Sequence, residues 1–235
     1  MMKEKIIGIL GGMGPEATAD LFIKVIKADP AKNDQEHLRI IIDCNSKIPD
    51  RTAHILKGAE DPEPYLIESA KLLEDAGAGL IIIPCNAAHT WYETIQRNVR
   101  IPVLHIMKST LKYVGRKYSH IKKIGLLAAS STVKVGHYQR IFIEKGIDVI
   151  SPEQKYQEMV MKAIRKVKAG NTKPEVTDLL VDAGNHLISR GAQGVIAGCT
   201  EIPIVLKNGD LSIPVVDPTH ALALTAVEEA RGAEN

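Results

Sequence analysis

The chain has 235 residues, which is enough for one large or two small domains with a substantial core. Hydrophobic residues make up 45% and charged residues 25%, a balance that is typical of globular proteins and excludes a disordered chain. The net charge is only +2 and the signs are interspersed, so we expect no binding to nucleic acid or to a membrane. Three cysteines are too few for a disulfide framework, and no apolar run is long enough to span a bilayer. These features predict a cytoplasmic globular protein.

Short apolar runs that end at Gly, Pro, Asn or Asp alternate along the chain with amphipathic stretches. The runs predict strands, in chain order, at residues 6–10, 38–43, 79–84, 102–106, 123–127, 148–150, 194–197 and 213–216. Their continuous Ile and Val content is typical of strands that are buried on both faces of a parallel sheet. Helical periodicity is clearest over residues 63–76 and 175–190, each followed by a glycine suited to a helix C-terminus. This alternation predicts an α/β fold.

The two halves of the chain resemble each other at three places that occur in the same order. The matching strings are IGILG (7–11) with IGLLA (124–128), IIPCN (82–86) with IAGCT (196–200), and IPVL (101–104) with IPVV (213–216). A nearly constant offset between them indicates two similar doubly wound domains with mainly parallel sheets, related by a pseudo-twofold axis. We expect residues 1–108, completed by 214–235, to form one domain and 109–213 the other. The active site is then expected in the cleft between them.

Cys85 and Cys199 each follow directly on a predicted strand, at the edge where open α/β sheets bind their ligands. Two thiols on opposite faces of a substrate carbon can invert its configuration. One thiolate removes a proton and the other thiol returns one to the opposite face. Because both halves place a cysteine in the same way, we favour a catalytic pair over two buried structural cysteines. Cys44 has no such counterpart, so we expect it to be structural.

Three motifs now point to a known family: GGMGP (11–15), PCNAAH (84–89) and AGCTE (197–201). Together they resemble the aspartate/glutamate racemase family along the whole chain, and the aspartate racemase branch more than the glutamate branch. The resemblance implies a cofactor-independent amino-acid racemase that forms a homodimer, with Cys85 and Cys199 as the paired acid and base. Glu201 stands where glutamate racemases typically carry a histidine, which argues against the glutamate branch.

The same resemblance assigns residues that bind the substrate. Arg51 matches the arginine for the side-chain carboxylate, and Lys168 looks like its lysine partner, although Lys166 and Lys162 are close alternatives. Met13 lies on the glycine-rich loop that lines the pocket. The residues that resemble those holding the α-carboxylate and α-ammonium are Asn86, Ala87, Ser131, Thr132 and Thr200. Glu201 could either orient the ammonium or favour the protonated form of the neighbouring thiol.

Other interpretations remain open at this point. The segment GMGPEA (12–17) fits the dinucleotide fingerprint of an NAD(P)-dependent oxidoreductase, with Asp43 as the ribose-binding acid. Pro15 argues against it, because proline removes a backbone donor from the phosphate-binding turn. Cys85 and His89 have the i, i+4 spacing of metal ligands, and His105 and His220 could contribute. No second paired-ligand motif accompanies them, so we expect no metal.

The substrate predicted from the sequence is a small molecule, most specifically L- and D-aspartate. A broad-specificity or glutamate racemase of the same family is the alternative within this class. A non-catalytic amino-acid-binding module is the alternative from another class; it would retain Arg51 and the glycine loop but would not need both cysteines.

Overall fold

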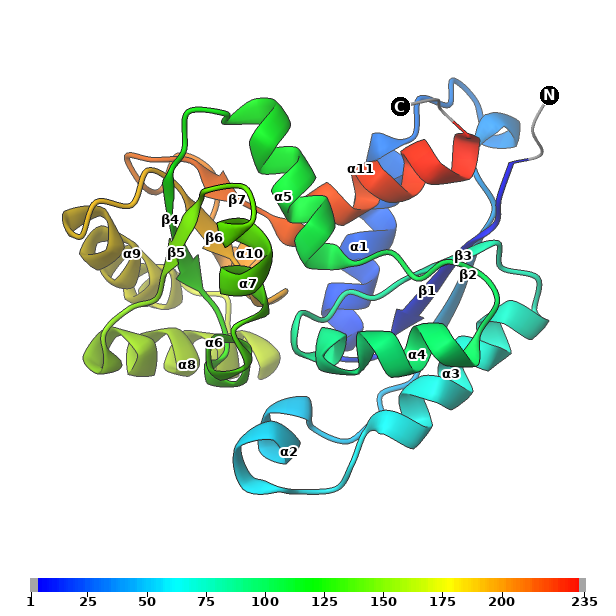
Figure 1. The fold of residues 1–235 in the computed structure, drawn as a ribbon, viewed down its shortest axis with the longest axis horizontal. Helices are drawn as coiled ribbons and strands as arrows, with labels where there is room; N and C mark the ends of the chain where they lie inside the picture. The colour runs from blue at the N-terminus through cyan, green and yellow to red at the C-terminus, as the bar shows by residue number, and fades with distance from the viewer. Residues whose placement is uncertain (1–3, 233–235) are drawn as a thin grey trace. The chain divides into compact units, whose positions relative to one another are not determined.

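The computed structural model describes residues 4–232 of the chain, which divide into two compact units (Figure 1). Of the described residues, 4–109 together with 219–232 form the first unit, and 110–218 form the second. The sequence places the return to the first domain at residue 214. In the structure the return comes later, because Val215 and Val216 pair with a strand of the second unit. Within residues 4–232, no helix combines the length and apolar character that crossing a bilayer requires.

The first unit contains a parallel sheet with the strand order β2-β1-β3. The strands are β1 (Ile7–Gly11), β2 (Ile40–Cys44) and β3 (Leu80–Ile82). Every position of β1 and β3 is buried, which explains their unbroken apolar composition. Instead of a full strand at residues 102–106, the structure has an isolated parallel bridge from Ile81 to Val103 that continues the sheet beyond β3.

The remaining elements of the first unit are helices and two short 3₁₀ segments. They are α1 (Pro15–Ala28), η1 (Asp34–Glu36), α2 (Arg51–Lys57), α3 (Glu63–Asp75), η2 (Ala87–Trp91), α4 (Tyr92–Asn98) and, beginning at the unit boundary, α11 (Pro218–Arg231). Helix α3 is the one expected at 63–76, and it buries Leu66, Ala70 and Leu73 at i, i+4 and i+7. Leu72, also apolar, points to solvent. Gly77 follows α3 with a φ of 95°, a left-handed conformation that suits glycine after a helix end.

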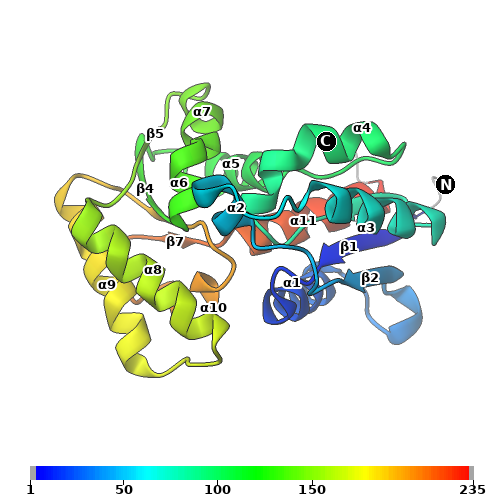
Figure 2. The ribbon, with the colours of Figure 1, turned by 90° about the horizontal axis from the view of Figure 1, so that it is seen from below.

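The second unit contains a parallel sheet with the strand order β5-β4-β6-β7. Its strands are β4 (Lys123–Leu127), β5 (Asp148–Ile150), β6 (Val195–Ala197) and β7 (Val215–Val216). Its helices are α6 (Ser130–Val135), α7 (His137–Ile143), α8 (Gln154–Lys168), α9 (Pro174–Ser189) and α10 (Ile202–Val205), and α5 (Ile106–Lys117) crosses the boundary between the units. Helices α8 and α9 pack side by side, as Figures 1 and 2 show.

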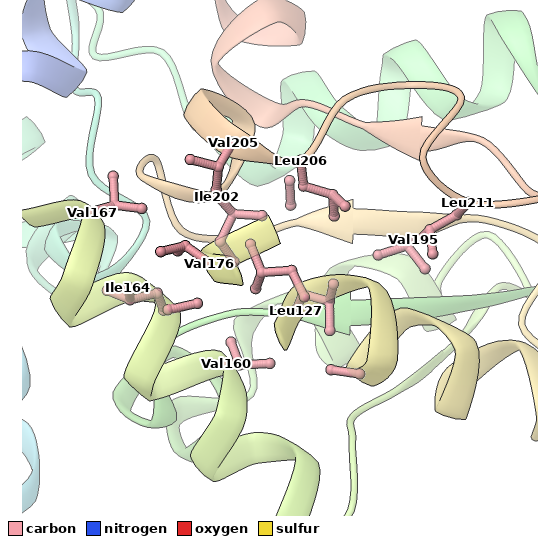
Figure 3. Close-up of a cluster of buried hydrophobic side chains, with 14 of the residues drawn as sticks. Leu127, Val160, Ile164, Val167, Val176, Val195, Ile202, Val205, Leu206 and Leu211 are labelled. Atoms are coloured by element: carbon pink, nitrogen blue, oxygen red, sulfur yellow. The ribbon is translucent and has the colours of Figure 1, made fainter. Parts of the chain in front are cut away.

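In the core of the second unit, side chains from the last turns of α8 pack against residues that follow β6. Val160, Ile164 and Val167 project from α8 at i, i+4 and i+7 and contact a cluster that includes Leu127 of β4 and Ile202 of α10 (Figure 3). Burial of each such side chain stabilises the fold by about 1.5–3 kcal/mol. The same packing holds the C-terminal end of α8 close to the start of α10, so the residues just outside these two ends are held close together.

The two sheets have the same topology, taken each by itself. In each, the first strand of the unit lies at the centre, its second strand on one side, and its third on the other. A Pro-Val pair then continues the sheet next to the third strand: Ile81 N–H donates to the Pro102 carbonyl and Val195 N–H to the Pro214 carbonyl, both at 2.9 Å. The prediction of two similar α/β domains with parallel sheets is confirmed.

Candidate active site

Cys85 lies in a buried turn just beyond the carboxyl end of β3. Its side chain belongs to the same core cluster as Met13 and Leu66, and its residue is 7% exposed. His89 fixes this turn with both ring nitrogens: Nε2 accepts from the Ile106 N–H at 3.1 Å, and Nδ1 therefore carries the proton donated to the Cys85 carbonyl at 2.9 Å. His89 is thus a structural part of the turn.

The residues after Cys85 are buried as well. Asn86 is 3% exposed, and Ala87 begins the 3₁₀ segment η2. Within residues 4–232, no group of three or more His, Cys, Asp or Glu side chains is arranged to hold a metal ion.

Arg51 and Met13, which the sequence assigns to one pocket, do lie together. Arg51 is the first residue of α2, whose N-cap is Asp50; the Asp50 carboxylate accepts from the Ala53 N–H at 2.7 Å. The Arg51 Nη2 donates to the Met13 carbonyl at 3.2 Å. Its Nη1 donates to the carbonyls of Ile48 at 3.1 Å and Pro49 at 2.8 Å. Backbone carbonyls from two segments therefore fix the guanidinium in place.

One donor of this guanidinium has no partner in the described part of the chain. Arg51 is only 8% exposed, and its buried Nε–H makes no hydrogen bond. A buried donor on a charged group that lacks an acceptor costs free energy. A carboxylate can accept from the edge of an arginine in a bidentate manner, so an anionic ligand at this position removes that cost. This is the chemistry expected of a site for a substrate side-chain carboxylate.

The glycine-rich loop is explained by packing within the unit. Gly12 has a φ of 87°, and a Cβ at this position would lie 2.2 Å from the backbone of Asn45. Its N–H is already donated to Thr18 Oγ1 at 2.9 Å, and Thr18 donates in turn to the Gly14 carbonyl. The N–H that a dinucleotide fingerprint offers to phosphate is therefore occupied. The loop carries Met13, whose carbonyl accepts from Arg51 Nη2.

Cys199 lies at the carboxyl end of β6 in the second unit and is half-buried. Its Sγ donates a hydrogen bond to Glu201 Oε2 at 2.9 Å. Thr200 Oγ1 donates to the same oxygen at 3.4 Å, and both Thr200 and Glu201 are buried. The Ile202 N–H closes the turn on the Cys199 carbonyl at 2.9 Å. Three consecutive residues of the sequence motif thus form one hydrogen-bonded group.

The structure places Lys168, rather than Lys166 or Lys162, beside this group. Lys168 is the last residue of α8, and its Nζ lies 3.9 Å from Glu201 Oε1. Its side chain is 41% exposed, so the ammonium faces both Glu201 and solvent. Lys162 is exposed and lies further back along the helix.

Ser131 and Thr132 lie in the first turn of α6, just beyond the carboxyl end of β4, and both are buried. Thr132 Oγ1 has no hydrogen-bond partner among residues 4–232. Gln157 of α8 reaches the same edge of the sheet, where its Nε2 donates to the Ala128 carbonyl at 2.9 Å and contacts Ser130 Oγ at 3.3 Å. Gln157 was not predicted from the sequence. Its spacing of three helical turns from Lys168 could have revealed it, because both residues then lie on one face of α8.

Cys44 differs from the other two cysteines. It ends β2, as expected from its position, but its side chain is exposed and takes no part in the core, contrary to the structural role expected of it. Cys85 and Cys199 lie in separate units, so their facing one another across a cleft stays a prediction.

Known proteins resemble this chain over most of its length. The family model described as Asp/Glu/hydantoin racemase matches residues 10–226. The chain is 31% identical over 228 residues to the broad-specificity amino-acid racemase RacX of Bacillus subtilis, an alignment that covers 94% of this chain and 96% of that protein.

Two solved structures are similar over nearly the whole chain. The aspartate racemase of Picrophilus torridus has a TM-score of 0.86 at 29% identity, covering 97% of this chain and 94% of that one. An aspartate racemase homologue from Pyrococcus horikoshii has a TM-score of 0.78 at 29% identity, covering 97% and 99%.

The fold of two similar parallel α/β units and the proteins it resembles are those of an amino-acid racemase. The chain belongs to the Asp/Glu/hydantoin racemase family.

Proposed function

We propose that this racemase interconverts L- and D-aspartate without a cofactor, with Cys85 and Cys199 exchanging protons with opposite faces of Cα. One observation carries the proposal. Each of two sheets with the same topology has a cysteine thiol just beyond the carboxyl end of its third strand. Ligands of α/β proteins bind at that edge. A pair of thiols at equivalent places suits a reaction in which two bases exchange roles.

The proton balance of the reaction is simple. The thiolate of one cysteine takes the proton of the Cα–H bond, and the electron pair of that bond moves into the α-carboxylate. The thiol of the other cysteine then gives its proton to the opposite face of Cα and becomes the thiolate. The product has the inverted configuration, and the two cysteines have exchanged protonation states.

The carbanionic intermediate needs hydrogen-bond donors at the α-carboxylate, because charge develops there. In the first unit Asn86 follows Cys85 directly, and in the second Thr200 follows Cys199. Ser131, Thr132 and Gln157 gather at the adjoining strand end of the second unit. We assign substrate binding to these groups, together with Met13 and Ala87.

Aspartate is favoured over neutral amino acids because of Arg51. Its buried Nε–H lacks an acceptor, and a second substrate carboxylate would supply one. Lys168 adds a cation in the second unit. Broad amino-acid specificity is the second candidate, since RacX is 31% identical over 94% of this chain.

The test is proton NMR of L-aspartate in D₂O with the purified protein, a chelator and no added cofactor. We expect the α-proton signal to decrease while D-aspartate appears. Exchange without inversion would contradict the two-thiol mechanism. Inversion of neutral amino acids at the rate found for aspartate would instead favour the broad-specificity candidate.

We also propose that the protein is a cytoplasmic homodimer. The first unit has exposed apolar side chains that a second copy could bury: Ile23, Ile42, Leu56 and Leu72. Light scattering coupled to gel filtration measures the mass directly. A mass equal to the 25.6 kDa of one chain would contradict the dimer.

A further inference from the structure

The contact between Cys199 and Glu201 distinguishes one thiol of the chain from the other two. The sulfur lies 2.9 Å from Glu201 Oε2, with the thiol as donor and the carboxylate as acceptor. A hydrogen bond to an ionised acceptor is stronger than one between neutral groups. With Glu201 ionised, this hydrogen bond exists only while the thiol keeps its proton. The contact therefore favours the protonated form of Cys199 over the thiolate.

Glu201 has the surroundings of an ionised carboxylate. It is 5% exposed, and a buried charge of this kind persists only when it is paired and hydrogen-bonded. Both conditions are met: Lys168 Nζ lies 3.9 Å from Oε1, and Thr200 Oγ1 donates to Oε2. Val167 and Ile202, the neighbours of Lys168 and Glu201, belong to one buried cluster, which holds this pair together (Figure 3).

A further ionisable group interacts with the thiol from another element, α7. Burial raises the pKa of Tyr138 in α7, which interacts electrostatically with Cys199, so this phenol is neutral when the thiols titrate. Asp217, which follows β7, interacts electrostatically with Tyr138 as well. Cys199 thus has the Glu201 carboxylate at hydrogen-bond distance and the neutral Tyr138 phenol as an electrostatic neighbour, and the ammonium of Lys168 lies beyond Glu201.

We propose that Glu201 is a positioning residue that holds Cys199 as the protonated thiol in the free enzyme, an inference that rests on the proposed function. Cys199 then begins a turnover as the proton donor, and Cys85 begins it as the base. After one inversion Cys199 is the thiolate and Cys85 the thiol. The resting state returns when Cys85 releases its proton to water and Cys199 takes one from water.

The first test uses the wild-type protein and no substrate. Iodoacetamide alkylates thiolates, so the alkylation rate of each cysteine, followed by peptide mass spectrometry from about pH 6 to pH 10, reports its titration. Cys44 is exposed and serves as the reference within the same chain. We expect the midpoint of Cys199 to lie above that of Cys44. A midpoint at or below that of Cys44 would overturn the proposal.

The second test replaces the carboxylate. Glu201→Gln keeps the size of the side chain and removes its charge, so the midpoint of Cys199 is expected to fall by about one pH unit, a tenfold faster alkylation below the midpoint. Glu201→Asp, which restores the charge, is expected to restore most of the difference. Glu175→Gln, an exposed position at the start of α9, is the matched control and should change nothing.

Far-ultraviolet circular dichroism shows whether a variant remains folded. An unchanged Cys199 midpoint in a folded Glu201→Gln protein would refute the role of Glu201 even if the enzyme racemises aspartate. A shifted midpoint in a protein without racemase activity would support the thiol–carboxylate pair and reject the proposed function. The two failures are therefore distinguishable.

Discussion

The three cysteines of the chain have different surroundings, and these predict different effects of their removal. Cys85 is buried in a turn fixed by His89, Cys199 donates to Glu201, and Cys44 is exposed at the end of β2. We expect Cys85→Ala and Cys199→Ala each to lower the rate of aspartate racemisation by at least about a hundredfold, as loss of a general acid or base does. Circular dichroism of L-aspartate measures the rate. A comparable loss in the control variant Cys44→Ala would refute the assignment.

The contacts of Arg51 predict that its substitution lowers turnover of aspartate more than turnover of a neutral amino acid. Arg51→Lys keeps the positive charge but cannot offer the side-on pair of donors that a carboxylate accepts. A hydrogen bond to a charged group contributes about 1.5–3 kcal/mol, so we expect kcat/KM for aspartate to fall about ten- to a hundredfold. Turnover of alanine, which has no side-chain carboxylate, is the internal control. An equal fall for both amino acids would show that Arg51 only holds the loop through the Met13, Ile48 and Pro49 carbonyls.

At the scale of elements, the close packing of the loop between β1 and α1 predicts that an alanine destabilises the protein more at Gly12 than at Gly58. Gly12 and Gly58 both have positive φ, so an alanine at either place is strained by about 1–2 kcal/mol. A Cβ at Gly58 meets nothing within 4 Å, whereas a Cβ at Gly12 meets the Asn45 backbone at 2.2 Å. Gly12→Ala should therefore lower the free energy of unfolding by about 1–3 kcal/mol more than Gly58→Ala. Urea denaturation measures both, and equal losses would contradict the proposed close packing.

The sequence predicted whether a segment is a helix or a strand correctly where its apolar residues repeat with one period over a long stretch. The apolar positions of residues 63–76 and 175–190 match α3 and α9 closely, and each helix is followed by a glycine with positive φ. The region 102–106 was harder to predict. Its apolar run predicts a strand. In the structure only Val103 pairs with the sheet, because Ile106 already begins α5. A short apolar string has no period of its own, so tertiary contacts decide its structure.

The candidate site, too, was predicted from the sequence only in part. The motifs located Cys85 and Cys199 beyond the strand ends. The family resemblance favoured Lys168, at the end of α8, and left Lys166 and Lys162 open as alternatives. The sequence did not show that Arg51 begins a helix, although the Asp50 cap is visible in it. It also left the role of Glu201 open. The hydrogen bond from Cys199 joins side chains two residues apart in an irregular turn, where no regular period indicates which side chains face each other.

For the whole molecule, the C-terminal helix is the element that completes the first unit. Arg231 in the last turn of α11 donates to Asp29 at the end of α1, to Glu4 near the start of the chain, and to the Glu36 carbonyl of η1. Asp29 is almost fully buried and also accepts from the Leu38 N–H at 2.9 Å. One arginine thus joins segments from both ends of the chain in a single unit.

We expect Arg231→Met to destabilise the first unit selectively. The variant leaves the buried Asp29 carboxylate with only the His37 ring, at 3.2 Å, and the Leu38 N–H as partners. Removing one partner of a buried ion pair costs about 3–5 kcal/mol. Hydrogen exchange followed by mass spectrometry should show faster exchange in β1, β2 and α11, while β4 and β6 of the second unit keep their protection, because these strands make no contact with Arg231. Lys27→Met, an exposed cation in the last turn of α1, is the matched control and should leave exchange unchanged. Faster exchange throughout both units would instead mean that the two units unfold as one cooperative body.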